Sequence, residues 1–264
     1  MGDYNSFVNK INDKLGIDLS LYKEAQMKRR LTSLRNKRGF NNFSSYFLAL
    51  SRDEVLKNEF LDRMTINVSE FYRNPKRWDI LRDKILPEII KEKKNNLKIW
   101  SAACSTGEEP YSLAIMLHEH FSNITYSIIA TDIDEKVLLK AKEGIYHPSA
   151  LKDLPAHKKS KYFLFKNNKF HINKELKASI SFKKHDLLKD PYPSNLDLIV
   201  CRNVLIYFTD PAKQIIYTRF GEALNPNGFL FVGSTEQIFN PNEFQLTLFD
   251  TFFYQKNKFD LQKK

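Results

Sequence analysis

Two adjacent carboxylates, Glu108 and Glu109, follow a stretch of small side chains within residues 99–112, Ile-Trp-Ser-Ala-Ala-Cys-Ser-Thr-Gly-Glu-Glu-Pro-Tyr-Ser. Residues 101–107 include no side chain larger than Cys or Thr, so the backbone there can approach a flat ligand closely. A phosphate-binding loop presents several glycines with a lysine or a bare helix N-terminus, whereas this loop presents negative charge. The stretch therefore favours a ligand that is cationic or rich in hydroxyl groups.

The same stretch predicts a strand followed by a helix. An apolar run ends at Trp100, Thr106 and Glu109 have the spacing of a capping box, and Pro110 suits a first helical turn. We expect the helix to run to about residue 121. Taken alone, the pattern is equally typical of a capped helix on a buried strand with no ligand.

Two other acidic residues follow predicted strands. Asp132 comes after the apolar run 126–130, and an acidic side chain at such a place can accept two hydrogen bonds from ribose hydroxyls. Asp134 is more simply explained as the N-cap of the next helix. Asp132 is therefore the candidate ligand residue. Asp186 follows the third apolar run, where it can read an adenine amino group. Its neighbour His185 is more typical of an ordinary surface or capping residue than of a metal ligand.

A guanidinium, an amide and a phenol follow the fourth predicted strand, residues 196–201. They belong to Arg202, Asn203 and Tyr207. Arg202 can equally form a local salt bridge, and residues 204–208 can simply be core.

The elements that must position these residues alternate between apolar runs and helical patterns. From residue 97 the order indicates an α/β fold with a doubly wound sheet, whose ligands bind beyond the carboxyl ends of the strands. An N-terminal all-helical domain is expected at 1–64 and a connector with a helix at 65–96, with Asn74 as N-cap and Pro75 as first residue of a helix reaching residue 86. The sheet domain takes 97–264, with a small antiparallel β insertion at about 160–183 and a β-rich C-terminal stretch that closes the sheet edge.

Positive charge is concentrated in one predicted helix. The chain has a net charge of +11, and residues 23–38 hold seven basic residues against one acidic residue. Met27, Leu31 and Leu34 recur at helical spacing, which predicts an amphipathic helix with a basic outer face. Its partner is an acidic protein surface or nucleic acid, or the face is simply solvated.

Composition sets milder limits. With 264 residues, of which 42% are hydrophobic, the chain can bury a sizeable core. No run approaches the ~18 apolar residues that span a membrane, and the N-terminus lacks the regions of a signal peptide, so we expect a cytoplasmic protein without membrane insertion. The two cysteines, Cys104 and Cys201, each end an apolar run and are expected to be buried fillers, with no disulfide framework and no metal site.

Five ordered motifs together resemble the CheR family of chemotaxis receptor methyltransferases. They are residues 67–73 (Asn-Val-Ser-Glu-Phe-Tyr-Arg), 100–112, 130–134 (Ala-Thr-Asp-Ile-Asp), 201–208 (Cys-Arg-Asn-Val-Leu-Ile-Tyr-Phe) and 228–236 (Gly-Phe-Leu-Phe-Val-Gly-Ser-Thr-Glu). The resemblance covers nearly the whole chain, including the helical N-terminal domain and the β insertion.

The resemblance implies a class I methyltransferase fold. It also implies methylation of glutamate side chains on chemoreceptor cytoplasmic helices, giving glutamyl methyl esters and S-adenosylhomocysteine from S-adenosylmethionine. It implies that Asp132 contacts the ribose and Asp186 the adenine. Arg73 and Tyr207 would lie nearest the transferred methyl group. The full cofactor set that it implies is Asn67, Ser69, Arg73, Glu109, Asp132, Asp186, Leu187, Arg202 and Asn203, with Glu108 as the alternative to Glu109.

The resemblance also gives the basic helix a partner, the acidic helical bundle of a chemoreceptor, docked by Lys28, Arg29, Arg30, Arg35 and Arg38. Some relatives bind a receptor tail peptide as an added strand of the β insertion, aided by a loop that contains glycine. Residues 166–169 lack glycine, so no such tether is expected here.

Two other functions stay open at this stage. A nucleic-acid methyltransferase is suggested by the net charge, but an amino-methylating enzyme should carry a motif like Asp-Pro-Pro-Tyr after the fourth strand, where this chain has Arg202-Asn203-Val204. Residues 190–193, Asp-Pro-Tyr-Pro, precede that strand and are typical of a turn. The second of these functions is a non-catalytic module that binds the cofactor and transmits a signal.

Overall fold

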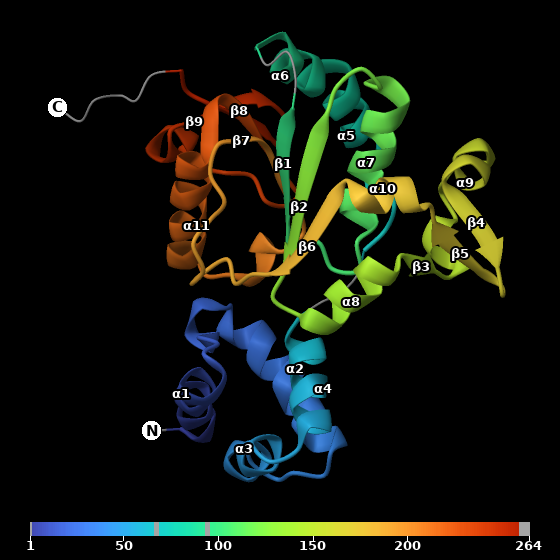
Figure 1. Ribbon diagram of the computed structural model, residues 1–264. Helices are drawn as coiled ribbons and strands as arrows, with labels where there is room; N and C mark the ends of the chain where they lie inside the picture. Colours follow the sequence, from blue (N-terminus) through green and yellow to red (C-terminus); the bar gives the residue numbers. More distant parts are fainter. Residues whose placement is uncertain (1, 66–68, 93–95, 259–264) are drawn as a thin grey trace. The chain divides into compact units, whose positions relative to one another are not determined.

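The computed structural model describes residues 2–65, 69–92 and 96–258, which form two compact units (Figure 1). One unit comprises Met1–Asn67 with Leu205–Gln214, and the other comprises Val68–Val204 with Ile215–Lys264. Each unit has its own core. In the described residues, no helix has the length and apolarity needed to span a membrane.

The first unit is helical, as expected. Its helices are α1 (Asp3–Leu15), α2 (Glu24–Lys37), α3 (Phe43–Leu50) and α4 (Glu54–Met64), with a short 3₁₀ turn η1 (Leu19–Leu21). The ring of Phe7 packs against Phe43, Tyr46 and Phe60, with ring centroids 4.9–6.1 Å apart. Burial of aromatic rings from α1, α3 and α4 around one point holds these short helices together.

Helix α2 buries the apolar stripe predicted for it. Met27, Leu31 and Leu34 are at most 4% exposed, which leaves the basic residues on the outer side. The sequence did not predict that a segment distant along the chain joins this unit. The 3₁₀ turn η4 (Leu205–Tyr207) is bound here because Lys23 N–H donates to the Tyr207 carbonyl at 2.9 Å.

The second unit contains a seven-stranded sheet in the order β6-β2-β1-β7-β8-β10-β9. The strands are β1 (Leu97–Ala102), β2 (Tyr126–Asp132), β6 (Ile180–Lys184), β7 (Leu196–Cys201), β8 (Leu224–Val232), β9 (Leu246–Asp250) and β10 (Phe253–Lys256). The first five strands of that order pair in parallel, and β10 is antiparallel to both of its neighbours. The strand order reverses direction between β1 and β7, which is where such sheets bind ligands.

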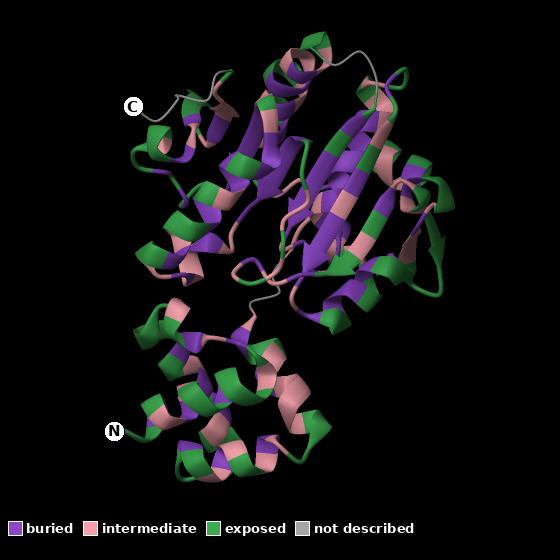
Figure 2. Ribbon diagram, turned by 60° about the vertical axis from the view of Figure 1, so that its left-hand side comes forward, coloured by how far each residue is buried: buried purple, intermediate pink, exposed green. Residues whose placement is uncertain are grey.

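Helices cover both faces of this sheet. Trp78, in α5 (Pro75–Ile80), packs on Phe231 of β8 on one face, beside α7 (Glu108–His120). Phe220, in α11 (Asp210–Ala223), packs on Trp100 of β1 on the other face. Figure 2 shows buried residues concentrated along the central strands. Because both faces of these strands are covered, their sequences are nearly continuous apolar runs.

The β insertion begins and ends earlier in the chain than the expected 160–183. Its strands β3 (Ile145–Tyr146), β5 (Lys169–Ile172) and β4 (Phe163–Lys166) lie in that order, next to α9 (Ala156–Tyr162) and the 3₁₀ turn η3 (Pro148–Leu151). Extending the insertion to residue 183 was wrong, because β6 pairs in parallel with β2 at the edge of the main sheet. Between the two sheets lies the short helix α10 (Lys174–Ala178). Because an edge strand is less buried than a central one, apolar and polar residues alternate in the sequence of β6 as they do in an antiparallel hairpin.

The capping box predicted for the helix after β1 was wrong. Helix α7 has Gly107 as its N-cap with φ of 94°, and the Thr106 hydroxyl donates to the Glu108 carboxylate instead of closing a capping box. Asn74 is the N-cap residue of α5 and Pro75 is its first residue, as predicted, although the Asn74 side chain makes no capping hydrogen bond and donates to Ser234 Oγ at 3.0 Å. That helix continues through a π-helical turn η2 (Leu81–Ile85) into α6 (Leu86–Glu92). Thr106 thus bonds a residue two positions away, whereas Asn74 bonds a residue far along the chain.

Candidate cofactor site

The loop after β1 follows a path that requires small residues. Ala103, Ser105 and Gly107 all have positive φ, at 59°, 50° and 94°. A Cβ on Gly107 would lie 2.9 Å from Ala141 Cβ and 3.1 Å from the Tyr146 hydroxyl, so only glycine fits that position. This tight path brings the loop back to the end of β2.

Asp132 lies at that end with its carboxylate fixed by the backbone. Its Oδ2 accepts a hydrogen bond from Ser105 N–H at 2.9 Å, and its Oδ1 accepts one from Asp134 N–H at 3.0 Å. Burial raises the pKa of Asp132 to about 6, against the lowering effect of these bonds. Asp134 caps α8 (Glu135–Glu143) through Lys136 N–H, as its position predicted. Each oxygen of Asp132 keeps a second lone pair for ligand hydroxyls.

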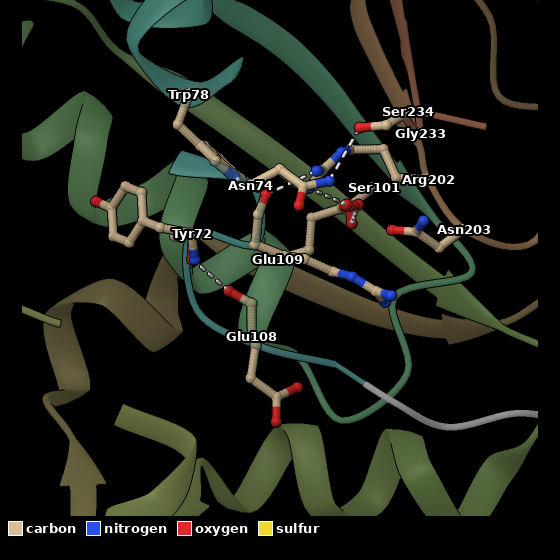
Figure 3. Close-up of polar contacts among 12 residues, drawn as sticks. Tyr72, Asn74, Trp78, Ser101, Glu108, Glu109, Arg202, Asn203, Gly233 and Ser234 are labelled. Atoms are coloured by element: carbon tan, nitrogen blue, oxygen red, sulfur yellow. Dashed lines mark hydrogen bonds and ion pairs between the residues drawn. The ribbon is translucent and has the colours of Figure 1, made fainter. Parts of the chain in front are cut away.

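Glu109 forms a buried cluster with Arg202 and Ser101 (Figure 3). Ser101 Oγ donates to Glu109 Oε1 at 2.8 Å, and Arg202 Nη1 lies 3.7 Å from Glu109 Oε2. Burial raises the pKa of Glu109 to about 7, although Arg202 and Ser101 act to lower it. The local salt bridge considered for Arg202 is therefore present, and it is made with a candidate ligand residue.

Glu108 has different partners from Glu109. Thr106 and Ser69 hydrogen-bond its carboxylate, and burial raises its pKa. Figure 3 shows Glu108 directed away from Ser101 and Arg202. Of the two adjacent carboxylates, Glu109 is thus the one beside the residues that follow β7.

The connector before α5 is held by hydrogen bonds to its backbone. The Arg73 carbonyl accepts from Arg202 Nη2 at 2.7 Å and from Trp78 Nε1 at 2.9 Å. Tyr72 has a positive φ of 52°, and its N–H donates to Ser112 Oγ at 3.0 Å. The structure thereby brings Arg73 and Arg202 together. Asn67 lies outside the described residues.

The loop after β6 uses its polar groups internally. Asp186 Oδ1 accepts from Leu188 N–H at 2.8 Å, and Leu187 is 7% exposed. The expectation of a surface or capping role for His185 was wrong, because its ring is buried against Trp100 and Tyr192, with centroids 5.3 and 5.5 Å away. Three aromatic rings meet at this point, which a local reading of the sequence does not reveal.

Sequence reasoning missed one residue of this region, Glu236. It is 4% exposed, and its Oε2 accepts hydrogen bonds from the N–H groups of Asn203 and Gly233, both at 2.7 Å. The rule that selected Asp132 could have found it, since Glu236 also follows closely after an apolar strand. Its motif entered only as part of the family resemblance.

Tyr207 and the basic residues belong to the helical unit. The guanidinium of Arg30 lies over the Tyr207 ring at 4.8 Å. Arg29, Arg30 and Arg63 line a cavity of about 570 Å³ together with Ser33, Asp62 and Thr65.

The other three predicted docking residues have partners of their own. Arg38 pairs with Glu59 at 2.6 Å, Arg35 lies over the Phe43 ring, and Lys28 lies over the Tyr4 ring. Only Arg29 and Arg30 of the predicted set therefore face the cavity, and Arg63 was not predicted.

The residues at the carboxyl edge of the sheet fit S-adenosylmethionine. Asp132 is a fixed acceptor at the end of the second strand, and Glu109 is an acceptor for a positively charged group. Arg202 Nε is buried with no hydrogen-bond partner among the described residues, so a donor is available next to Glu109. Buried acceptors and a donor at the same edge of the sheet suit a ligand that carries ribose hydroxyls and an amino acid.

Comparisons with known proteins agree with this fit. Residues 67–253 match the family described as CheR methyltransferase, SAM binding domain, and residues 2–65 match CheR methyltransferase, all-alpha domain. A chemotaxis protein methyltransferase of Listeria innocua is 42% identical over 96% of this chain and 97% of its own length. Proteins of the same name from Borreliella burgdorferi and Salmonella typhimurium are 36% and 32% identical, over 89% and 87% of this chain and 88% and 82% of their own lengths.

These matches extend over both units. The two matched family domains together span residues 2–65 and 67–253, and the second is an S-adenosylmethionine-binding domain. The chain belongs to the CheR methyltransferase family.

Proposed function

We propose that this protein methylates glutamate side chains on the cytoplasmic helices of chemoreceptors, giving glutamyl methyl esters. The observation that carries the proposal is the buried cluster of Glu109, Arg202 and Ser101, together with the fixed carboxylate of Asp132 at the end of the neighbouring strand β2. The names of the relatives, chemotaxis protein methyltransferase, support the receptor as substrate.

The reaction requires the protein to position its substrates and does not require it to transfer a proton. A substrate glutamate, with an ordinary pKa of ~4.3, is already ionised at neutral pH, so no general base is needed. S-Adenosylmethionine supplies an activated methyl group whose carbon–sulfur bond breaks as the new carbon–oxygen bond forms, and the sulfur keeps the electron pair. The protein must hold the carboxylate oxygen in line with that bond.

We assign the residues of the site to separate tasks. Asp132 binds the ribose, and Asp186 with Leu187 lies toward the adenine. Glu109 holds a positively charged part of the cofactor. Arg73 holds a carboxylate of cofactor or substrate, and Tyr207 orients the substrate oxygen. Asn67, Ser69, Arg202 and Asn203 complete the cofactor set.

The basic residues of α2 would dock an acidic receptor helix. Arg29 and Arg30, joined by Arg63 from α4, are the cations that face the cavity. Lys28, Arg35 and Arg38 add to the positive potential, which steers an acidic partner and weakens with salt. Methylation removes a negative charge from the receptor and so favours release of the product.

The proposal includes cytoplasmic action without a receptor tail tether. The β4–β5 turn uses Asn167 and Asn168, both at positive φ, in place of a loop containing glycine.

Nucleic acid is the less favoured substrate, since Arg202-Asn203-Val204 follows β7.

The test is incubation with methyl-labelled S-adenosylmethionine, receptor-containing membranes and, in parallel, RNA. We expect label on the receptor, and much less with Asp132→Ala. Label on RNA, or none anywhere with the cognate receptor present, would contradict the proposal.

A further inference from the structure

One carboxylate oxygen bridges the ends of two neighbouring strands in the sheet unit. Glu236 Oε2 accepts from Asn203 N–H, two residues beyond β7, and from Gly233 N–H, one residue beyond β8. Glu236 N–H also donates to the Gly233 carbonyl at 3.0 Å, so a tight turn folds the side chain back between the strands. The carboxylate is buried, so these bonds form in a medium of low dielectric, where they are strong.

The two residues that Glu236 bridges each depend on it. Asn203 has φ of 63°, in the left-handed region that asparagine adopts more readily than other non-glycine residues, and its N–H is held by Glu236 Oε2. A Cβ on Gly233 would lie 2.3 Å from Glu236 Oε2 and 2.9 Å from Asn203 N. Gly233 is therefore required by the close approach of the carboxylate, and the carboxylate in turn fixes the position of the Asn203 N–H.

We propose that Glu236 is a positioning residue of the cofactor site. It holds Asn203, and with it the neighbouring Arg202 that pairs with Glu109, in the conformation that receives the cofactor. This inference rests on the assignment of Asn203 to the cofactor in the proposed function. It adds that the assigned set is pre-organised by a side chain that does not itself touch the ligand.

Binding of S-adenosylhomocysteine to the full chain, measured by calorimetry, tests the inference without any methyl transfer. Glu236→Ala is expected to weaken binding at least about tenfold, or 1.4 kcal/mol. Glu236→Gln keeps an acceptor oxygen of the same reach and is expected to remain within about threefold of the wild type. The matched control is Glu243→Ala, an exposed glutamate in a following segment, with no change expected. Unchanged binding by Glu236→Ala would overturn the inference.

A double-mutant cycle shows whether Glu236 acts through Asn203. Asn203→Gly removes the side chain and tolerates the positive φ, and it is expected to weaken binding by itself. Adding Glu236→Ala to Asn203→Gly is then expected to weaken binding by less than it does in the wild-type background, and the remaining loss is the part that acts through Arg202. An equal loss in both backgrounds, or no loss from Asn203→Gly, would overturn the inference.

Gly233→Ala provides a second route that leaves the carboxylate in the chain. Its methyl group must displace Glu236 Oε2, so a loss similar to that of Glu236→Ala is expected, and wild-type affinity would count against the inference. These results separate the inference from the proposed function. If substrate glutamate is the wrong acceptor, methyl transfer to the receptor fails while the binding pattern of the variants stays as expected.

Discussion

Glu109 and Arg202 form an ion pair, with Oε2 and Nη1 3.7 Å apart, in which the side chains are only 13% and 2% exposed. Arg202 also donates from Nη2 to the Arg73 carbonyl. One guanidinium therefore links the first turn of α7 to the connector. Buried pairs of this kind are costly to break, because removing one partner leaves an uncompensated charge.

Replacing Arg202 should therefore affect stability and binding together. Arg202→Ala is expected to lower the free energy of unfolding by about 3 kcal/mol and to weaken cofactor binding at least tenfold. Denaturant unfolding and calorimetry measure the two effects. The matched control is Arg52→Ala, an exposed arginine of the helical unit, where both should stay near wild type. Wild-type affinity in Arg202→Ala would contradict the site.

Opposite pH trends are expected for stability and for cofactor affinity. Folding raises the pKa of Glu109 to about 7 and of Asp132 to about 6, so between about pH 4.5 and 7 the folded state binds more protons than the unfolded state. Stability of the free protein should then fall as pH rises through that window. The affinity for S-adenosylmethionine should rise over the same range, because both carboxylates become ionised. Thermal unfolding with and without cofactor measures both, and a ligand-induced Tm shift that shrinks from pH 5.5 to 7.5 would contradict this.

Tyr72→Phe is expected to stabilise the protein. The Tyr72 hydroxyl is buried with no hydrogen-bond partner among the described residues, so its removal should raise the free energy of unfolding by about 1 kcal/mol. The matched control is Tyr111→Phe, whose buried hydroxyl donates to the Ala141 carbonyl at 2.8 Å and should cost about 1 kcal/mol when lost. Equal effects of the two substitutions on the denaturation midpoint would refute the distinction.

Charge reversal in the arginine cavity should weaken receptor docking. Arg29→Glu and Arg63→Glu are each expected to raise KM for the receptor about tenfold with little change in kcat, and to reduce its dependence on salt. Arg52→Glu makes the same charge change at an exposed site elsewhere in the helical unit and should have a smaller effect. If all three variants methylate receptor alike, the cavity is not the docking site.

The β insertion should not bind a receptor tail peptide tightly. Its β4–β5 turn is closed by Asn167 and Asn168 rather than by a longer loop with glycine. Calorimetry with the C-terminal peptide of the cognate receptor should give no binding in the low micromolar range. A saturable isotherm there would show that the tether does not need the glycine.

The placement of residues at strand ends could be predicted, whereas contacts with partners distant along the chain could not. Strand β7 has the predicted bounds, because a central strand buried on both faces leaves an unbroken apolar run. The capping box at Thr106 failed because Gly107 already provides the left-handed turn that starts α7.

The bridge from Glu236 to Asn203 spans 33 residues and two strands. No local sequence pattern predicts a contact between residues so far apart in the chain. The same is true of the turn at Leu205–Tyr207, which is fixed by the helical unit through Lys23. For these features the sequence supplies the residue types but not the pairing.

The chemical nature of the transferred methyl group tests the central claim most directly. After receptor is labelled with methyl-labelled S-adenosylmethionine and the free cofactor is removed, mild base treatment should release the label as volatile methanol, because a glutamyl ester is hydrolysed under these conditions. Label that stays on the receptor through base treatment would mean an amide, amine or thioether product and would contradict glutamate as the acceptor.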